Sequence, residues 1–438
     1  MAGTGFFSNI RPSMGDFQFG GLSPKDRVIF VIQAAVILAA PIWLLLDARN
    51  SIAFILFLAS LLLVQKIKLP VFWRLALVVI DLAVVMPIVG AASGTFSRVA
   101  TMIGIYAILS MGLNIVVGYT GLLNLGYAAF YAVGAYTYAI FASRQAANFI
   151  PFGTFPISGN WFWLFLLIAL VVAGFVGFLL GLPVMRLKGD YLAVVTLGFA
   201  EIIRLLFNNL SKPVNITNGP MGITPISPPM LFDIPLNRPV HYYGVVLVLF
   251  VLTVIVVRNL QNSRIGRAWV AIREDELVAR TMGVPVVRMK LLSFSIAAGL
   301  AGMMGVVFAA MQSYVDPTSF TFMESIVILA MVILGGTGNM KGVIIGALAV
   351  IVLQLQILKD VSEWLTSLTT SGVLNLPAWL NPAKYERLIF GLILVLMCIF
   401  RPNGLIPEKR MLQIKAKLGI KAKPAKGDGT IAAQKGGR

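Results

Sequence analysis

Twelve apolar runs dominate this sequence, and most of them approach the length that crosses a lipid bilayer. They are Val28–Leu46, Ala53–Val64, Val71–Ala92, Val99–Val117, Leu122–Ala142, Trp161–Leu182, Tyr191–Phe207, Tyr242–Val257, Leu291–Met311, Ser325–Leu334, Val343–Leu358 and Leu388–Phe400. The second, tenth and twelfth fall well short of the roughly 20 residues that a bilayer core requires. Only 12% of the residues are charged, against roughly 25% in a soluble domain. The runs therefore predict an all-α polytopic membrane protein, a bundle of about 10–12 transmembrane helices.

Basic side chains collect in alternate loops between these runs, as they do on the cytoplasmic side of a membrane. The basic loops are Gln65–Pro70, Pro183–Asp190 with Arg186 and Lys188, Arg258–Lys290 and the C-terminal tail. One loop, Lys359–Arg387, departs from the pattern because its three basic residues fall on the opposite side. The pattern predicts that both termini are cytoplasmic. The net charge of +18 then favours membrane lipids over nucleic acid as a partner, because no aromatic residues interleave with the lysines of the tail.

We expect four parts in this chain. They are a cytoplasmic arm at 1–24, an N-terminal transmembrane extension at 25–98, a transmembrane domain at 99–407 and a basic cytoplasmic tail at 408–438. The first 24 residues lack the continuous apolar core of a signal peptide. The single cysteine, Cys398, excludes an intramolecular disulfide, and the single histidine, His241, is expected in a solvated loop. We predict neither a metal site nor a catalytic residue.

The segment 258–290 is charged where its neighbours are apolar, with seven basic and three acidic residues. On a helical wheel, Ile265, Ala268, Trp269 and Ile272 share one face, whereas Arg267 and Glu274 lie opposite. The segment is therefore expected to form a short amphipathic helix pair in water, with Gly283 ending a helical run Glu274–Met282. Such a pair suits docking onto a soluble partner, although an ordinary basic cytoplasmic loop would have a similar composition.

Three polar residues inside the spans are candidates for a translocation path. Asn114 and Asn124 flank a glycine-rich break and are expected to cap broken helix ends. Glu201 and Arg204 lie three residues apart on one helix and can pair, so a structural role is as well supported as a transport role. We also expect Glu201 to face the interior of the bundle. Asp81 has no evident partner on its own helix.

The sequence does not carry the motifs of an ATPase or a metal-dependent enzyme. The run GGTGNMKG lacks the serine or threonine that follows the lysine of a phosphate-binding loop, and no H-E-x-x-H is present. The loop Asn208–His241 contains seven prolines and the phrase ITNGPMGI, which predicts turns. It could be a docking site for a soluble delivery protein or a plain connection.

Five blocks in order resemble the permeases of branched-chain amino acid ABC importers, of the LivM type. The blocks are GYTGLLNLGYAAFYAVGAY, GLPVMRLKGDYLAVVTLGFAEIIR, TNGPMGI, GRAWVAIREDELVARTMGV and SFTFMESIVILAMVILGGTGNMKG. The resemblance implies a permease that pairs with a second, LivH-like permease and two ABC ATPase subunits, and that receives substrate from a periplasmic binding protein. ATP and Mg²⁺ would then belong to the partner subunits, with no cofactor in this chain. The location implied is the bacterial inner membrane.

The resemblance also assigns roles to residues. It places the ATPase-coupling segment at 262–283, on Gly266, Arg267, Arg273, Glu274, Asp275, Glu276, Ala279 and Gly283. It matches the family's external loop to Asn218, Gly219 and Pro220, and its acidic residue after T-L-G-F to Glu201. Leucine, isoleucine or valine is the implied substrate, with urea or a short amide as the alternative. An ATP-independent secondary transporter and a membrane enzyme acting on lipid are the less favoured hypotheses.

Overall fold

The computed structural model describes residues 80–150, 155–184, 190–231 and 234–370, with scattered positions at 54–58 and 388–406. The helices are α4 Met86–Ala92, α5 Gly94–Asn114, α6 Tyr127–Ala139, α7 Phe162–Val184, α8 Asp190–Asn209, α9 Pro239–Asn262, α10 Arg264–Glu274, α11 Glu276–Thr281, α12 Val286–Gln312, α13 Phe322–Gly335, α14 Met340–Val352 and α15 Leu358–Thr370. Three π-helical turns continue them, η3 Asp81–Val85, η4 Ile115–Tyr119 and η9 Leu353–Ile357. A two-stranded antiparallel sheet pairs β1 Met230–Leu231 with β2 Ile234–Pro235. The predictions for the arm 1–24, most of the extension 25–98, Arg186, Lys188, Cys398 and the tail 408–438 fall outside the described residues.

The prediction of an all-α polytopic membrane protein is confirmed. Within the described residues, six helical stretches are long and apolar enough to cross a membrane. They are Gly94–Tyr119, Gly159–Val184, Tyr191–Asn209, Pro239–Asn262, Val286–Gln312 and Met340–Trp364, and two shorter apolar helices are Asp81–Ala91 and Phe322–Gly335. The total of 10–12 spans stays a prediction, because several runs lie outside the described residues.

One predicted span, Leu122–Ala142, was wrong in its first turn. Residues 120–126 are not helical, and α6 begins only at Tyr127. The backbone turns at Gly121, whose φ of +72° is left-handed and is readily adopted only by glycine. Because α6 also ends at Ala139, three residues before the predicted end, it has 13 residues and is too short to cross a bilayer by itself.

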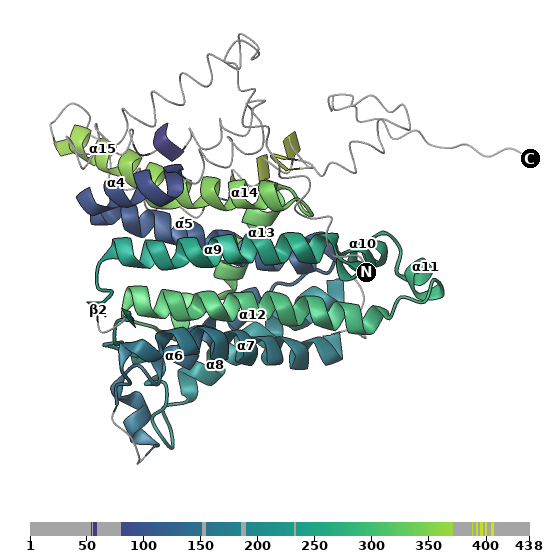
Figure 1. Ribbon diagram of the computed structural model, residues 1–438, viewed down its shortest axis with the longest axis horizontal. Coiled ribbons are helices and arrows are strands. Elements are labelled where there is room, and N and C mark those ends of the chain that lie inside the picture. The colour runs from purple at the N-terminus through teal and green to yellow at the C-terminus, as the bar shows by residue number, and fades with distance from the viewer. Residues whose placement is uncertain are drawn as a thin grey trace, which may run out of the picture.

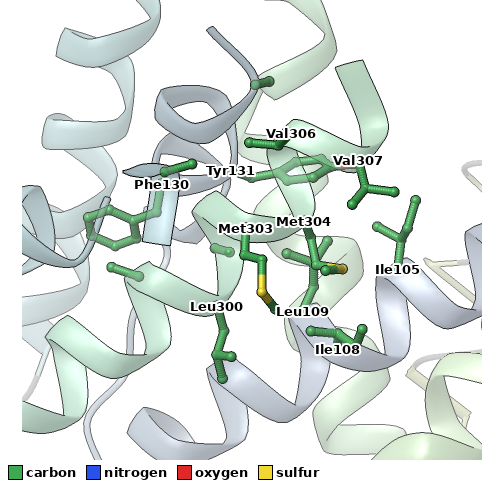
Figure 2. Close-up of a cluster of buried hydrophobic side chains, with 14 of the residues drawn as sticks. Ile105, Ile108, Leu109, Phe130, Tyr131, Leu300, Met303, Met304, Val306 and Val307 are labelled. Carbon is green, nitrogen blue, oxygen red and sulfur yellow. The ribbon is translucent and has the colours of Figure 1, made fainter. Parts of the chain in front are cut away.

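Helix α12 runs through the middle of the described bundle, against α5, α6 and α7 (Figure 1). Figure 2 shows Ile105, Ile108 and Leu109 of α5 facing Met303 and Met304 of α12, all buried. A side chain at Gly134 of α6 would overlap the backbone of Gly302 in α12. These small residues therefore let α6 and α12 pack backbone to backbone, as transmembrane helices commonly do.

The bundle has two distinct ends. Helices α10 and α11 project at one end, and β2 lies at the other (Figure 1). Between them, α13 begins well inside the bundle, because Glu324 in its first turn accepts a hydrogen bond from Tyr106. Tyr106 lies 12 residues along α5, or about 18 Å at 1.5 Å per residue. Helix α6 begins beside it, since the Ala128 amide donates to Ser325 Oγ (2.9 Å).

Candidate translocation path and coupling segment

The charged segment folds as two short helices whose ends are fixed by their own polar side chains. Ser263 Oγ accepts from the Gly266 amide (3.3 Å) at the start of α10. Asp275 ends α10, and its Oδ1 accepts from the amides of Leu277 (2.8 Å) and Val278 (3.0 Å) to begin α11. The predicted helix pair is therefore confirmed. The single run Glu274–Met282 was wrong, because Asp275 is extended and acts as an N-cap.

Three polar contacts attach this pair to the bundle. Trp269, fully buried, donates from Nε1 to the Met289 carbonyl (2.7 Å). Lys290, 5% exposed, donates to Glu276 Oε2 (2.7 Å). Arg273 Nη1 donates to the carbonyl of Gly118 (2.5 Å). Since the first two join the segment to α12 and the third joins it to η4, the segment can transmit displacement to two membrane elements.

The segment's other face is exposed and mixed in character. Arg267 and Glu274 are exposed, as the helical wheel predicted. Leu277 is 71% exposed and Met282 is 79% exposed, and Gly283 follows with a left-handed φ of +82°. Exposed apolar side chains rimmed by charge are typical of a surface that binds a protein partner.

Gly266 and Ala279, two of the residues assigned to coupling, are buried rather than exposed. A side chain at Gly266 would overlap the carbonyls of Leu260 and Gln261 at the end of α9. Ala279 packs with Ile272 of α10 in a small apolar cluster. These two positions therefore shape the segment, and the surface offered to a partner comes from their neighbours.

The break between α5 and α6 is held by the two predicted asparagines. Asn124 Oδ1 accepts from the Gly126 amide (2.9 Å) in the turn before α6. Gly126 itself is the N-cap of α6 and makes no side-chain cap hydrogen bond, so the prediction that Asn124 caps the helix was wrong. Asn114 acts differently, because its Oδ1 accepts from the distant amide of Gly338 (2.9 Å). The Nδ2 groups of both are buried and have no hydrogen-bond partner within the described residues, which is uncommon for buried polar groups.

Glu201 and Arg204 form the predicted ion pair on α8. The side chain of Glu201 is 44% exposed and that of Arg204 is 26% exposed. Within this chain Glu201 thus lies at the open edge of the bundle and not in its packed interior. Much of α8 is similarly uncovered, with Tyr191, Val194 and Ile202 exposed.

The external-loop motif is a rigid turn. Asn218 has a left-handed φ of +60°, held by its amide donating to Asn215 Oδ1 (2.8 Å) and its Nδ2 donating to the Gly222 carbonyl (2.8 Å). Gly219 is buried, whereas Pro220 is exposed. The loop is tied to the connection before α13 by backbone bonds between Ile223 and Val315.

Comparison with known proteins gives the family. Residues 95–398 match the family described as "Branched-chain amino acid transport system / permease component". The chain belongs to this family. It is 40% identical to the high-affinity branched-chain amino acid transport system permease protein LivM of Salmonella typhimurium, over 73% of this chain and 72% of that protein. A probable LivM of Methanocaldococcus jannaschii is 27% identical over 72% of this chain and 94% of its own. The high-affinity branched-chain amino acid transport system permease protein LivH of Salmonella typhimurium is 23% identical over 69% of this chain and 91% of that protein. No solved structure matches significantly.

One polar group of this permease was missed from the sequence. Glu324 was not among the predicted site residues, yet it lies in the first turn of α13 inside the bundle and accepts from the Tyr106 hydroxyl. The hydroxyl of Tyr131 on α6 is buried and has no partner within the described residues, and the Tyr131 ring packs against Phe320, four residues before Glu324. The available signal was the shortness of the run Ser325–Leu334, because a half-length apolar run implies a helix that starts inside the membrane.

Proposed function

We propose that this permease is a subunit of an ATP-driven importer of branched-chain amino acids, leucine, isoleucine or valine. The observation that carries the proposal is the segment α10–α11, which is anchored to α12 and η4 and keeps an exposed apolar face. A protein that hydrolysed ATP while seated on this face would move α10 and, through Arg273, the break at Gly118. The family match and the LivM relatives support the substrate class.

The partners we propose follow from the same surfaces. Two ABC ATPase subunits, with their ATP and Mg²⁺, would bind α10–α11 and its counterpart on a second permease. The LivH relative suggests that second permease, and the uncovered face of α8 with Glu201 is our candidate for the shared path. A periplasmic binding protein would dock at the opposite end, on the turn at Asn218–Pro220, where Met221 is 78% exposed.

The proposed location is the bacterial inner membrane, with α10–α11 and both termini in the cytoplasm. Import then proceeds by alternating access, in which helix groups rock against each other around a site inside the membrane. This chain does no chemistry of its own in that scheme. A urea or short-amide permease is not favoured, because the LivM and LivH relatives carry branched-chain amino acid names.

Purification from detergent, with the chain tagged at its N-terminus, tests the proposal. We expect ATPase subunits and a second permease to co-purify, and leucine-loaded binding protein to stimulate hydrolysis. A chain that purifies alone and moves solute in vesicles without ATP would instead support an ATP-independent secondary transporter.

A further inference from the structure

The N-terminal ends of α6 and α13 meet inside the bundle. Helix α6 has 13 residues and α13 has 14, so neither crosses a bilayer alone. They are joined at their starts by the hydrogen bond from the Ala128 amide to Ser325 Oγ (2.9 Å). The amides of Gly126, Ala128 and Ala129 already donate within the protein, so the attraction of these two ends for a carboxylate comes from the aligned backbone dipoles of α6 and α13.

A carboxylate of the protein stands at the same place. Glu324 lies in the first turn of α13 and accepts a hydrogen bond from the Tyr106 hydroxyl of α5. It forms no salt bridge with any lysine or arginine within the described residues. Glu324 as a whole residue is half-buried. An acidic group within a membrane bundle usually pairs with a cation, and here the protein supplies none from its described part.

A second, independent observation is the hydroxyl of Tyr131. This residue lies one turn into α6 and is 1% exposed, and its hydroxyl has no hydrogen-bond partner within the described residues. Its ring packs against Phe320, which lies four residues before Glu324 in the chain. The rings of Phe308 and Phe320 each lie 5.3 Å from the Tyr131 ring, centroid to centroid. A polar group is thus held among apolar rings without a partner, which is costly unless a ligand supplies one.

We propose that these groups form the recognition site for a zwitterionic α-amino acid in transit, a role that rests on the proposed import function. Glu324 accepts the substrate's ammonium group, and the facing ends of α6 and α13 with the Tyr131 hydroxyl bind its carboxylate. Phe308 and Phe320 line the place of an apolar side chain. Urea and short amides lack both charges, so the site selects against them.

The test uses the whole transporter, in proteoliposomes with its ATPase subunits and binding protein. Uptake of labelled leucine and ATP hydrolysis are measured together for Glu324→Gln and Glu324→Asp. We expect Glu324→Gln to lower uptake at least about tenfold, since a hydrogen bond to a charged group is lost, while hydrolysis stimulated by loaded binding protein is retained. Glu324→Asp keeps the charge and should retain more uptake than Glu324→Gln.

A purely structural role for Glu324 gives the opposite order. Gln has the same size and still accepts from Tyr106, so it would be tolerated better than Asp, and that order would overturn the proposal. Glu363→Gln is the matched control, because Glu363 is a 68% exposed carboxylate on α15 and should leave uptake unchanged. If Glu324→Gln does not assemble, Tyr131→Phe takes its place, with a several-fold loss of uptake expected and unchanged uptake refuting the site.

The two proposals fail differently. If the wild-type transporter moves leucine with ATP and Glu324→Gln does so equally well, only the recognition site is wrong. If the wild-type complex moves no amino acid at all, the import function is wrong and the site is overturned with it.

Discussion

Replacing Arg273 by Gln should uncouple ATP hydrolysis from transport without detaching the ATPase. Arg273 is the side chain through which α10 reaches the break after α5, with Nη1 donating to the Gly118 carbonyl (2.5 Å). Gln is shorter and neutral, so this contact is lost. The other two anchors of the segment, Trp269 and the Lys290–Glu276 pair, remain. The helix pair should therefore stay folded and bound while its link to η4 is broken.

The size of the effect follows from the contact removed. A hydrogen bond from a charged donor contributes about 1.5–3 kcal/mol, and we take the lower end because Arg273 is only half-buried. About 1.4 kcal/mol corresponds to a tenfold change in an equilibrium constant. The population in which α10 is bound to η4, relative to the population in which it is not, should therefore fall about tenfold. A conformational change is driven only as far as such differences allow, so leucine uptake per ATP hydrolysed should fall by up to about the same factor.

The assay measures uptake and hydrolysis in the same proteoliposomes. Arg288→Gln is the control, because Arg288 is an exposed arginine in the first turn of α12 and its replacement changes the net charge equally. We expect the control to couple like the wild type. An uptake-to-hydrolysis ratio in Arg273→Gln equal to that of the wild type would refute the coupling role of this contact. An equal loss in both variants would show that charge at this end, and not the bond to Gly118, determines coupling.

Two further predictions concern the same end of the bundle. Gly121→Ala should lower the thermal unfolding temperature, because φ is +72° there and a left-handed backbone costs an L-residue about 1–2 kcal/mol. Gly198→Ala is the control and should not lower the unfolding temperature, because the added carbon would meet no other described part of the protein within 4 Å. An equal unfolding temperature for the two variants would contradict this prediction. Glu274→Lys combined with Arg267→Glu reverses two exposed charges and should leave membrane insertion intact but reduce co-purification of the ATPase, an expectation that undiminished transport would rule out.

Local patterns in the sequence were enough to predict the amphipathic helix pair. The spacing of Ile265, Trp269 and Ile272 places them on one face because the helical period is a local property, and the structure half-buries the first and buries the other two. The ion pair of Glu201 and Arg204 was predictable for the same reason, being three residues apart on one helix.

Contacts between distant segments could not be predicted in this way. Asn114 lies 224 residues from Gly338, and Tyr106 lies 218 residues from Glu324. Such pairs depend on how the helices pack and on the depth in the membrane at which each helix begins. The spacing of apolar residues in the sequence does not predict either. The late start of α6 at Tyr127 has the same origin, because a run of apolar residues does not reveal where the backbone leaves the helix.

The coupling segment and the proposed recognition site are connected through one continuous set of contacts. Arg273 bonds to Gly118 in the turn that continues α5, and Asn114, the last residue of α5, bonds to Gly338 just after α13. Helix α13 ends at Gly335, three residues before Gly338, and carries Glu324 in its first turn, so a shift of Gly338 that moved α13 as a rigid unit would displace Glu324. Contiguity alone does not establish energetic coupling, but a double-mutant cycle can measure it. If the effects of Arg273→Gln and Glu324→Gln on uptake multiply as independent factors, the two sites act separately. If uptake by the double variant is no lower than uptake by the more impaired single variant, the two residues act on one step of the transport cycle.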